Sequence, residues 1–220
     1  MDCQNFSDEQ LLIVAEQLLH QISEKKSENK RIPVGISNRH IHLCRQDIET
    51  LFGRGFNLVP KNYLSQPGQF ASDQTVSVVG VKGSIHNVRV LGPERCVSQL
   101  EISRTDSFQL GVKAPVNESG NLTNAGSALI IGPKGSVQLK ENVIIAKRHI
   151  HMTPKDAKRF AVTQGQIVSV KTTGERTTVF GETIIRIDDG FCLECHLDMD
   201  EANAAGLNNK HSFVEIIKEI

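Results

Sequence analysis

The chain has 220 residues, enough for one large domain or two small ones that each bury a core. Its 25 Lys and Arg balance 25 Asp and Glu, and aromatic residues are only 5% with no Trp, so charge and stacking argue against nucleic-acid and anionic-membrane partners. Short apolar runs, an acidic N-terminus and five cysteines without disulfide-scaffold spacing predict a cytoplasmic protein without a membrane partner.

Residues 1–27 are predicted to form an N-terminal amphipathic helix and a linker. Ser7 is a candidate N-cap with Gln10 three residues later, and the charged segment "SEKKSENKR" follows the helix. Two interpretations stay open, because such a helix either packs on its own domain or is offered to a partner. Its apolar residues recur at helical spacing: Leu11, Leu12, Val14, Ala15, Leu18, Leu19 and Ile22.

Beyond the linker the sequence predicts short strands punctuated by Gly, Pro, Asn and Asp. Many short strands at modest spacing are typical of barrels or sandwiches with a few short helices between them. The fold class is therefore predicted to be mainly β. The expected strands are "RIPVGIS", "TVSVVGV", "HNVRVLG", "QLEIS", "ALIIG", "SVQLK", "NVIIAK", "IVSVKT", "TVFGETIIRI", "CLECHLD" and "SFVEII".

An Arg-His-Ile-His motif occurs twice, in "SNRHIHL" and in "KRHIHM". The same offset of 109 residues relates His40 to His149 and His42 to His151. Side chains at i and i+2 leave the same face of a strand, so both histidines of a pair are expected to point together. The repeat predicts two similar domains, each with a histidine pair at a strand end.

A short helix is predicted after each histidine pair. In the second copy Thr153 is the N-cap, Pro154 is at N1, and Asp156 is in the first turn, where the helix dipole favours a negative charge. The first copy has Asp47 at the same offset but Cys44 at the cap position. The first of the two helices therefore carries the weaker signal.

The two histidine pairs predict metal binding. Imidazole is a common zinc ligand, and two imidazoles on one strand face make half of a tetrahedral site. A catalytic zinc site needs three protein ligands and a structural one needs four, so each pair requires further ligands from distant parts of the chain.

Four segments resemble the PduL-type phosphate propanoyltransferases, which are phosphotransacylases acting on short acyl-CoA thioesters. These segments are "IPVGISNRHIHL", "GPERCVSQLEISRTD", "VIIAKRHIHMTP" and "CHLDMDEANAAG", and the resemblance runs from Arg31 to Ile217. It implies two small β-barrels with two zinc ions between them. It also implies that residues 39–146 form the first barrel and 147–220 the second, which the strand within 28–38 joins.

The resemblance further implies the residues of the site. Arg95 falls where the family binds phosphate, and the pocket is lined by Ser37, Arg89 and Asn203. One zinc would be held by His40, His42 and Glu101, and the other by His149, His151 and His196.

The implied reaction is a reversible conversion of acyl-CoA and phosphate to acyl phosphate and CoA. Paired metal ions can polarise the thioester carbonyl, and Arg95 would grip phosphate oxygens with its planar fork. Direct attack by bound phosphate is expected, because no nucleophile motif such as Gly-x-Ser-x-Gly is present. The substrate partners are thus acyl-CoA and phosphate.

Two other functions stay open at this point. A bicupin also uses H-x-H, but it needs a Glu a few residues later, and only the first copy offers one, Glu49. A zinc-stabilised scaffold without activity would have closed sites with four ligands. Arg39 and Arg148 either orient the histidines or form ordinary ion pairs, and "GPKGS" is expected to be a tight turn.

Location and assembly also stay open. Members of the family are found free in the cytoplasm or inside bacterial microcompartments, which they enter through a short amphipathic N-terminal helix. Residues 1–27 resemble such a helix, so shell or core proteins of a microcompartment are candidate partners. A homo-oligomer is a further candidate assembly.

Overall fold

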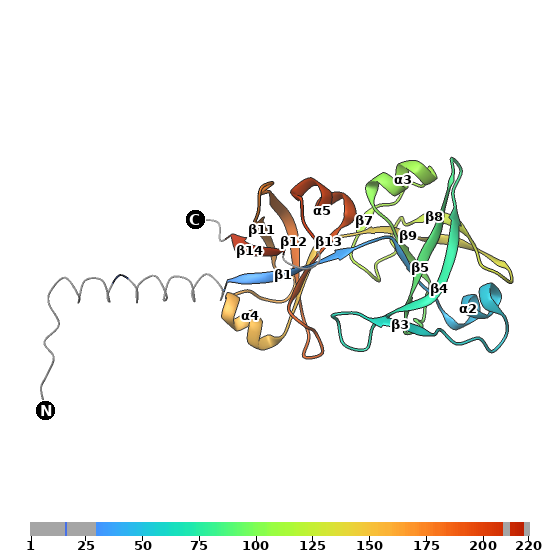
Figure 1. Cartoon of the computed structure of the whole chain (residues 1–220), viewed down its shortest axis with the longest axis horizontal. Coiled ribbons are helices and arrows are strands. Elements are labelled where there is room, and N and C mark those ends of the chain that lie inside the picture. Colours follow the sequence, from blue (N-terminus) through green and yellow to red (C-terminus); the bar gives the residue numbers. More distant parts are fainter. Residues whose placement is uncertain (1–15, 17–29, 209–211, 218–220) are drawn as a thin grey trace, which may run out of the picture.

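The computed structural model describes residue 16, residues 30–208 and residues 212–217. Figure 1 shows two β-barrels lying side by side, with short helices around them. The predicted amphipathic helix falls within residues 1–27, outside the described part of the chain, and stays a prediction. Among the described residues, no helix combines the length and apolar character needed to cross a membrane.

The first barrel closes through six strands in the order β4, β5, β2, β6, β9 and β8, with β8 pairing back to β4. Two shorter strands, β3 (Pro60–Tyr63) and β7 (Val116–Asn117), extend β4 and β9 at its margins. The six barrel strands are β2 (His40–His42), β4 (Phe70–Val79), β5 (Ser84–Gly92), β6 (Gln99–Glu101), β8 (Gly126–Ile131) and β9 (Ser136–Ala146).

The second barrel closes through β1, β13, β10, β12, β11 and β14. Its first strand precedes the whole first barrel in the sequence and runs parallel to β13 and antiparallel to β14. The strands are β1 (Arg31–Ser37), β10 (His149–Met152), β11 (Ile167–Thr172), β12 (Val179–Ile187), β13 (Glu194–Asp198) and β14 (Phe213–Ile217). The predicted fold class, two small barrels in a mainly β chain, is confirmed.

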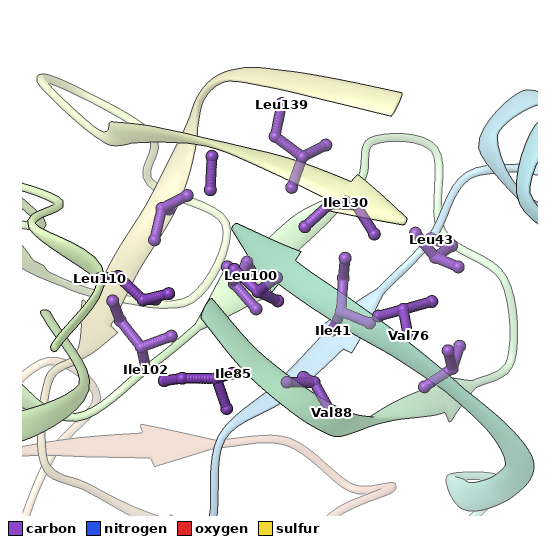
Figure 2. Packing of buried hydrophobic residues seen from close by; sticks show 14 of the residues in the cluster. Ile41, Leu43, Val76, Ile85, Val88, Leu100, Ile102, Leu110, Ile130 and Leu139 are labelled. Atoms are coloured by element: carbon purple, nitrogen blue, oxygen red, sulfur yellow. The ribbon is translucent and has the colours of Figure 1, made fainter. Parts of the chain in front are cut away.

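Each barrel has its own apolar core. Figure 2 shows the first core, where Ile41 lies with Leu100, Val88 and Ile130 between the strands. Ile41 and its repeat counterpart Ile150 are both fully buried. Alternation along a strand therefore directs the isoleucine of each motif into a barrel core and the flanking histidines to the opposite face.

Four short helices are present among the described residues. The helices α2 (Arg45–Phe52) and α4 (Pro154–Phe160) follow the histidine pairs as predicted. Thr153 and Asp156 form the expected capping box of α4. Cys44 makes no side-chain cap for α2, but the Ser98 hydroxyl accepts from the Cys44 amide at 2.9 Å and donates to Asp47. Ser98, which directly precedes β6, thus takes the place of the missing side-chain cap of α2.

The other two helices were not placed by the sequence analysis. They are α3 (Arg104–Leu110), capped by Ser103, and α5 (Met199–Ala205), capped by Asp198. Both have complete capping boxes, formed with Asp106 and Glu201 respectively. Each cap stands two residues after the residue that faces the first histidine of a pair, Glu101 or His196, so the internal repeat extends to a second strand and helix in each barrel.

Because β1 contributes Ile32 and Val34 to the core of the second barrel, Ile32→Ala is expected to destabilise that barrel. Ile32 is fully buried, and such a truncation costs about 2–5 kcal/mol of unfolding free energy. Hydrogen exchange should show the loss of protection mainly in β10 to β14. Ile167→Ala, at a position that is 44% exposed in the same barrel, is the control and should cost much less. Equal losses in both barrels would contradict the expectation.

Candidate active site between the two barrels

A cavity of about 550 Å³ lies between the barrels and is lined by both. Asn203 does not line it, because this residue is exposed on α5. The structure brings together the other nine residues predicted for the site: Ser37, His40, His42, Arg89, Arg95, Glu101, His149, His151 and His196.

In the first barrel, strand register sets a buried group of three candidate ligands. His40 and His42 leave the same face of β2, and Glu101 on the antiparallel β6 stands directly opposite His40. Ligand atoms of the three residues lie within 4.8 Å of one another. Ser119 and Gln99 both donate to Glu101 Oε1, at 2.9 and 2.6 Å, so Oε2 faces His40 Nε2 at 3.5 Å.

The second barrel repeats this arrangement with three histidines. His196 on β13 stands directly opposite His149 on β10, as Glu101 stands opposite His40. The ligand atoms of His149, His151 and His196 also lie within 4.8 Å of one another. The rings of His149 and His196 stack at a centroid distance of 4.8 Å, and Phe191 stacks on His151 at 4.1 Å.

Burial keeps His42, His149 and His151 neutral. It lowers the pKa of His42 to about 3, with His40 and Arg95 acting in the same direction. Burial and the other histidines of the group likewise lower the pKa of His149 to about 4 and that of His151 to about 2. Burial alone would raise the pKa of Glu101, but the nearby histidines and Ser119 outweigh it and bring the pKa to about 2. These three histidines and Glu101 are therefore in the protonation states that bind metal.

Unpaired ring nitrogens fit a metal at both groups. Within the described residues, His42 Nδ1 and both ring nitrogens of His151 are buried without a hydrogen-bond partner. A buried polar atom left unpaired costs about 1–3 kcal/mol, and a metal ion would remove that cost. Neutral imidazoles and one carboxylate are suitable ligands for zinc, with three protein ligands per ion.

Four arginines line the cavity, namely Arg39, Arg89, Arg95 and Arg186, and the last of them was not predicted from the sequence. Arg89 donates to the carbonyl oxygens of Ser72 and Asp73 at 3.0 and 2.9 Å, whereas Arg95 donates to Ser119 at 3.3 Å. Arg186 on β12 stands next to His151 in the parallel pairing of β12 with β10. Burial lowers the pKa of Arg95, and Arg186 is close enough to lower it further. Two cations that line one cavity favour an anionic ligand there, although Glu101 opposes the shift in the pKa of Arg95.

A loop of the first barrel contacts the second barrel beside the cavity. Gln66 donates to the carbonyl oxygen of Cys192 and accepts from its amide, both at 3.1 Å. Ser65 donates to Glu194, whose Oε2 lies 3.0 Å from His196 Nε2. No local sequence pattern indicates these contacts, because they join residues more than 120 positions apart.

The structure also bears on the alternatives. Glu49, the candidate cupin ligand, lies on α2 and pairs with Arg45 at 2.9 Å, away from both groups. "GPKGS" is a tight turn between β8 and β9, where the Gly132 amide donates to the Gly135 carbonyl. None of the described cysteines lines the cavity, and burial raises the pKa of the Cys195 thiol. A bicupin site and a cysteine nucleophile are therefore not supported.

Two groups of candidate metal ligands and a cluster of arginines open on one cavity between two barrels. This combination is typical of an enzyme that acts on an anionic substrate. Comparison with known proteins agrees with that class. Residues 33–208 match the family model described as phosphate propanoyltransferase.

Curated relatives match almost the whole chain. A phosphate propanoyltransferase of Thermotoga maritima is 50% identical over 89% of this chain and 95% of its own. Proteins of the same name from Lachnoclostridium phytofermentans and Salmonella typhimurium are both 49% identical, over 90% and 84% of this chain and 94% and 89% of their own. The chain therefore belongs to the phosphate propanoyltransferase family of acyltransferases, as its sequence motifs predicted.

Proposed function

We propose that this protein transfers a propanoyl group reversibly between CoA and phosphate, in a reaction that depends on two zinc ions. Acetyl-CoA is a second candidate substrate. The observation that carries the proposal is the convergence of both ligand groups and two arginines on one cavity, in a chain of this family.

One zinc would be held by His40, His42 and Glu101, and the other by the three histidines of the second barrel. Bound there, the metal would polarise a carbonyl and stabilise negative charge. Arg95 and Arg186 would hold phosphate from the side of the cavity, and Ser37 and Arg89 would complete its lining. Because both barrels supply walls, the bound substrates would be shielded from water, and hydrolysis of the thioester would be limited.

The proposed chemistry is a direct displacement. A phosphate oxygen attacks the thioester carbonyl carbon, a C–O bond forms, and the C–S bond breaks as sulfur leaves with the bonding pair as CoA thiolate. The products are acyl phosphate and CoA. No acyl-enzyme is needed, since no described cysteine lines the cavity and the Cys195 thiol is buried.

The direct test combines metal analysis with an acyl-CoA assay. The full chain is expected to hold two zinc ions, to release CoA from propanoyl-CoA only when phosphate is present, and to lose activity with a chelator and regain it with zinc. His151→Ala should reduce the metal content by one ion. Retention of zinc without CoA release from acetyl-, propanoyl- or butanoyl-CoA would overturn the transferase function and favour a scaffold.

Arg95→Gln and Arg186→Gln test the proposed phosphate grip. Each change removes charged hydrogen bonds worth about 1.5–3 kcal/mol, so KM for phosphate should rise about 10-fold to 100-fold while KM for propanoyl-CoA changes little. Arg54→Gln, at an exposed position outside the cavity, is the control and should leave both KM values unchanged. An equal rise in both KM values for Arg186→Gln would exclude a specific role in binding phosphate.

The N-terminal segment is proposed to direct the protein to a microcompartment. If it serves only as an address, removal of residues 1–26 should leave kcat and the melting temperature unchanged and should abolish co-purification with shell or core proteins. A fall in melting temperature on deletion would show that the segment packs on the barrels. Fusing residues 1–26 to an unrelated fluorescent protein is the matched experiment for targeting.

A further inference from the structure

Each histidine pair is directly preceded by an arginine, and the two arginines make equivalent contacts. Arg39 forms a two-pronged pair with Asp106, in which Nε lies 2.9 Å from Oδ2 and Nη2 lies 2.8 Å from Oδ1. In the second barrel, Arg148 Nε lies 3.1 Å from Glu201 Oε1. Both acids occupy the N3 position of a helix, Asp106 in α3 and Glu201 in α5. The internal repeat therefore preserves an ion pair that local sequence does not reveal.

The acids belong to capping boxes that follow the third candidate ligand of each group. Asp106 accepts from the amide of Ser103, which is two residues after Glu101. Glu201 accepts from the amide of Asp198 at 2.9 Å, two residues after His196. Each arginine thus forms an ion pair with the acid of the capping box that begins two residues after the third ligand.

The arginines also stand on the segments that orient the histidine rings. His40 Nδ1 donates to the carbonyl oxygen of Asn38 at 2.8 Å, and His149 Nδ1 donates to that of Lys147 at 2.9 Å. Each bond spans the arginine and leaves Nε2 of the histidine free to face the ligand group. Movement of the arginine backbone would therefore turn the ring.

Together these contacts form a closed loop around each ligand group. The strand pairing sets the first histidine opposite the third ligand, with His40 facing Glu101 and His149 facing His196. The arginine directly precedes the first histidine, and its side chain pairs with an acid. That acid lies five residues after the third ligand, as Asp106 does after Glu101. The loop is joined at one end by strand hydrogen bonds and at the other by the ion pair.

We propose that Arg39 and Arg148 are positioning residues, each of which fixes the separation between its histidine pair and the third metal ligand. The inference rests on the proposed metal sites. It predicts that each arginine controls metal affinity in its own barrel and not in the other. A purely structural ion pair would instead lower the stability of the protein without distinguishing the two sites.

The test measures zinc affinity at one site at a time. The full chain with His42→Ala retains the second ligand group, and the full chain with His151→Ala retains the first. Arg148→Gln and Arg39→Gln are introduced into each background, and zinc binding is measured by competition with a chelator. Burial raises the pKa of Glu201 to about 7, with Arg148 opposing the rise, so measurements at about pH 8 keep this pair ionised.

Loss of a residue that holds a metal ligand in position typically weakens metal binding about 10-fold to 100-fold. Arg148→Gln is expected to weaken zinc by that factor in the His42→Ala background and by less than about 2-fold in the His151→Ala background. Arg39→Gln should show the reverse pattern. Glu201→Gln keeps a capping residue at N3 but removes the charge, so it should reproduce Arg148→Gln, and the double variant should add little.

Arg45→Gln is the matched control, since it breaks an exposed ion pair with Glu49 on α2 and should leave both affinities unchanged. If Arg39→Gln does not fold, Arg39→Lys keeps the charge and loses the two-pronged geometry, and its effect should still be confined to the first site. Equal weakening at both sites, or none, would overturn the inference. A wild-type chain that binds no zinc would overturn the metal sites themselves, whereas zinc binding insensitive to both arginines would overturn only this inference.

Discussion

The site depends on one constraint, the register in which two short antiparallel strands meet in each barrel. Because His40 faces Glu101 and His149 faces His196, three ligand groups gather at one point although they lie up to about 60 residues apart in the chain. A slip of one residue would turn every side chain of the strand to the other face. The buried isoleucine between each pair of histidines opposes such a slip, since it would have to leave its core. The packing of each barrel core and the geometry of its ligand group therefore depend on the same strand register.

The two groups have the same geometry but different charge. The first contains the carboxylate of Glu101 and the second contains only imidazoles, but the carboxylate of Glu194 lies 3.0 Å from His196 Nε2 beside the second group. Arg186 adds positive charge beside the second group, next to His151. Arg89 on β5 and Arg95, which lies between β5 and β6, line the cavity from the first barrel, so positively charged side chains lie on both sides of it. The two halves of the cavity therefore differ in their ligands and in the arrangement of their charges, although the motif repeats.

Features with a local period were predictable from the sequence, and features set by long-range pairing were not. The histidine pairs, the strands and the capped helix after Thr153 follow from spacing and cap residues. Glu101 and His196 came only from family resemblance, because their partners are fixed by strand register. Arg186 is a single charged residue in "TIIRI", and only the pairing of β12 with β10 places it next to His151. The expected break between "SVQLK" and "NVIIAK" is absent, since β9 continues through Glu141, which adopts a positive φ of 57°. The helices α3 and α5 had readable caps, but their short apolar faces gave little periodicity.

The placement of β1 affects how the protein is made. This strand is synthesised before the first barrel, yet its partner strands β13 and β14 are the last two strands of the described residues. At common rates of about 5–20 residues per second, it waits roughly 10–35 seconds for the final strand. During that time its backbone hydrogen-bonding groups are open to other chains, as at any unpaired strand edge. The first barrel can close before β14 is made, but the second can close only after the residues of β14 emerge, so the cavity between them is completed last.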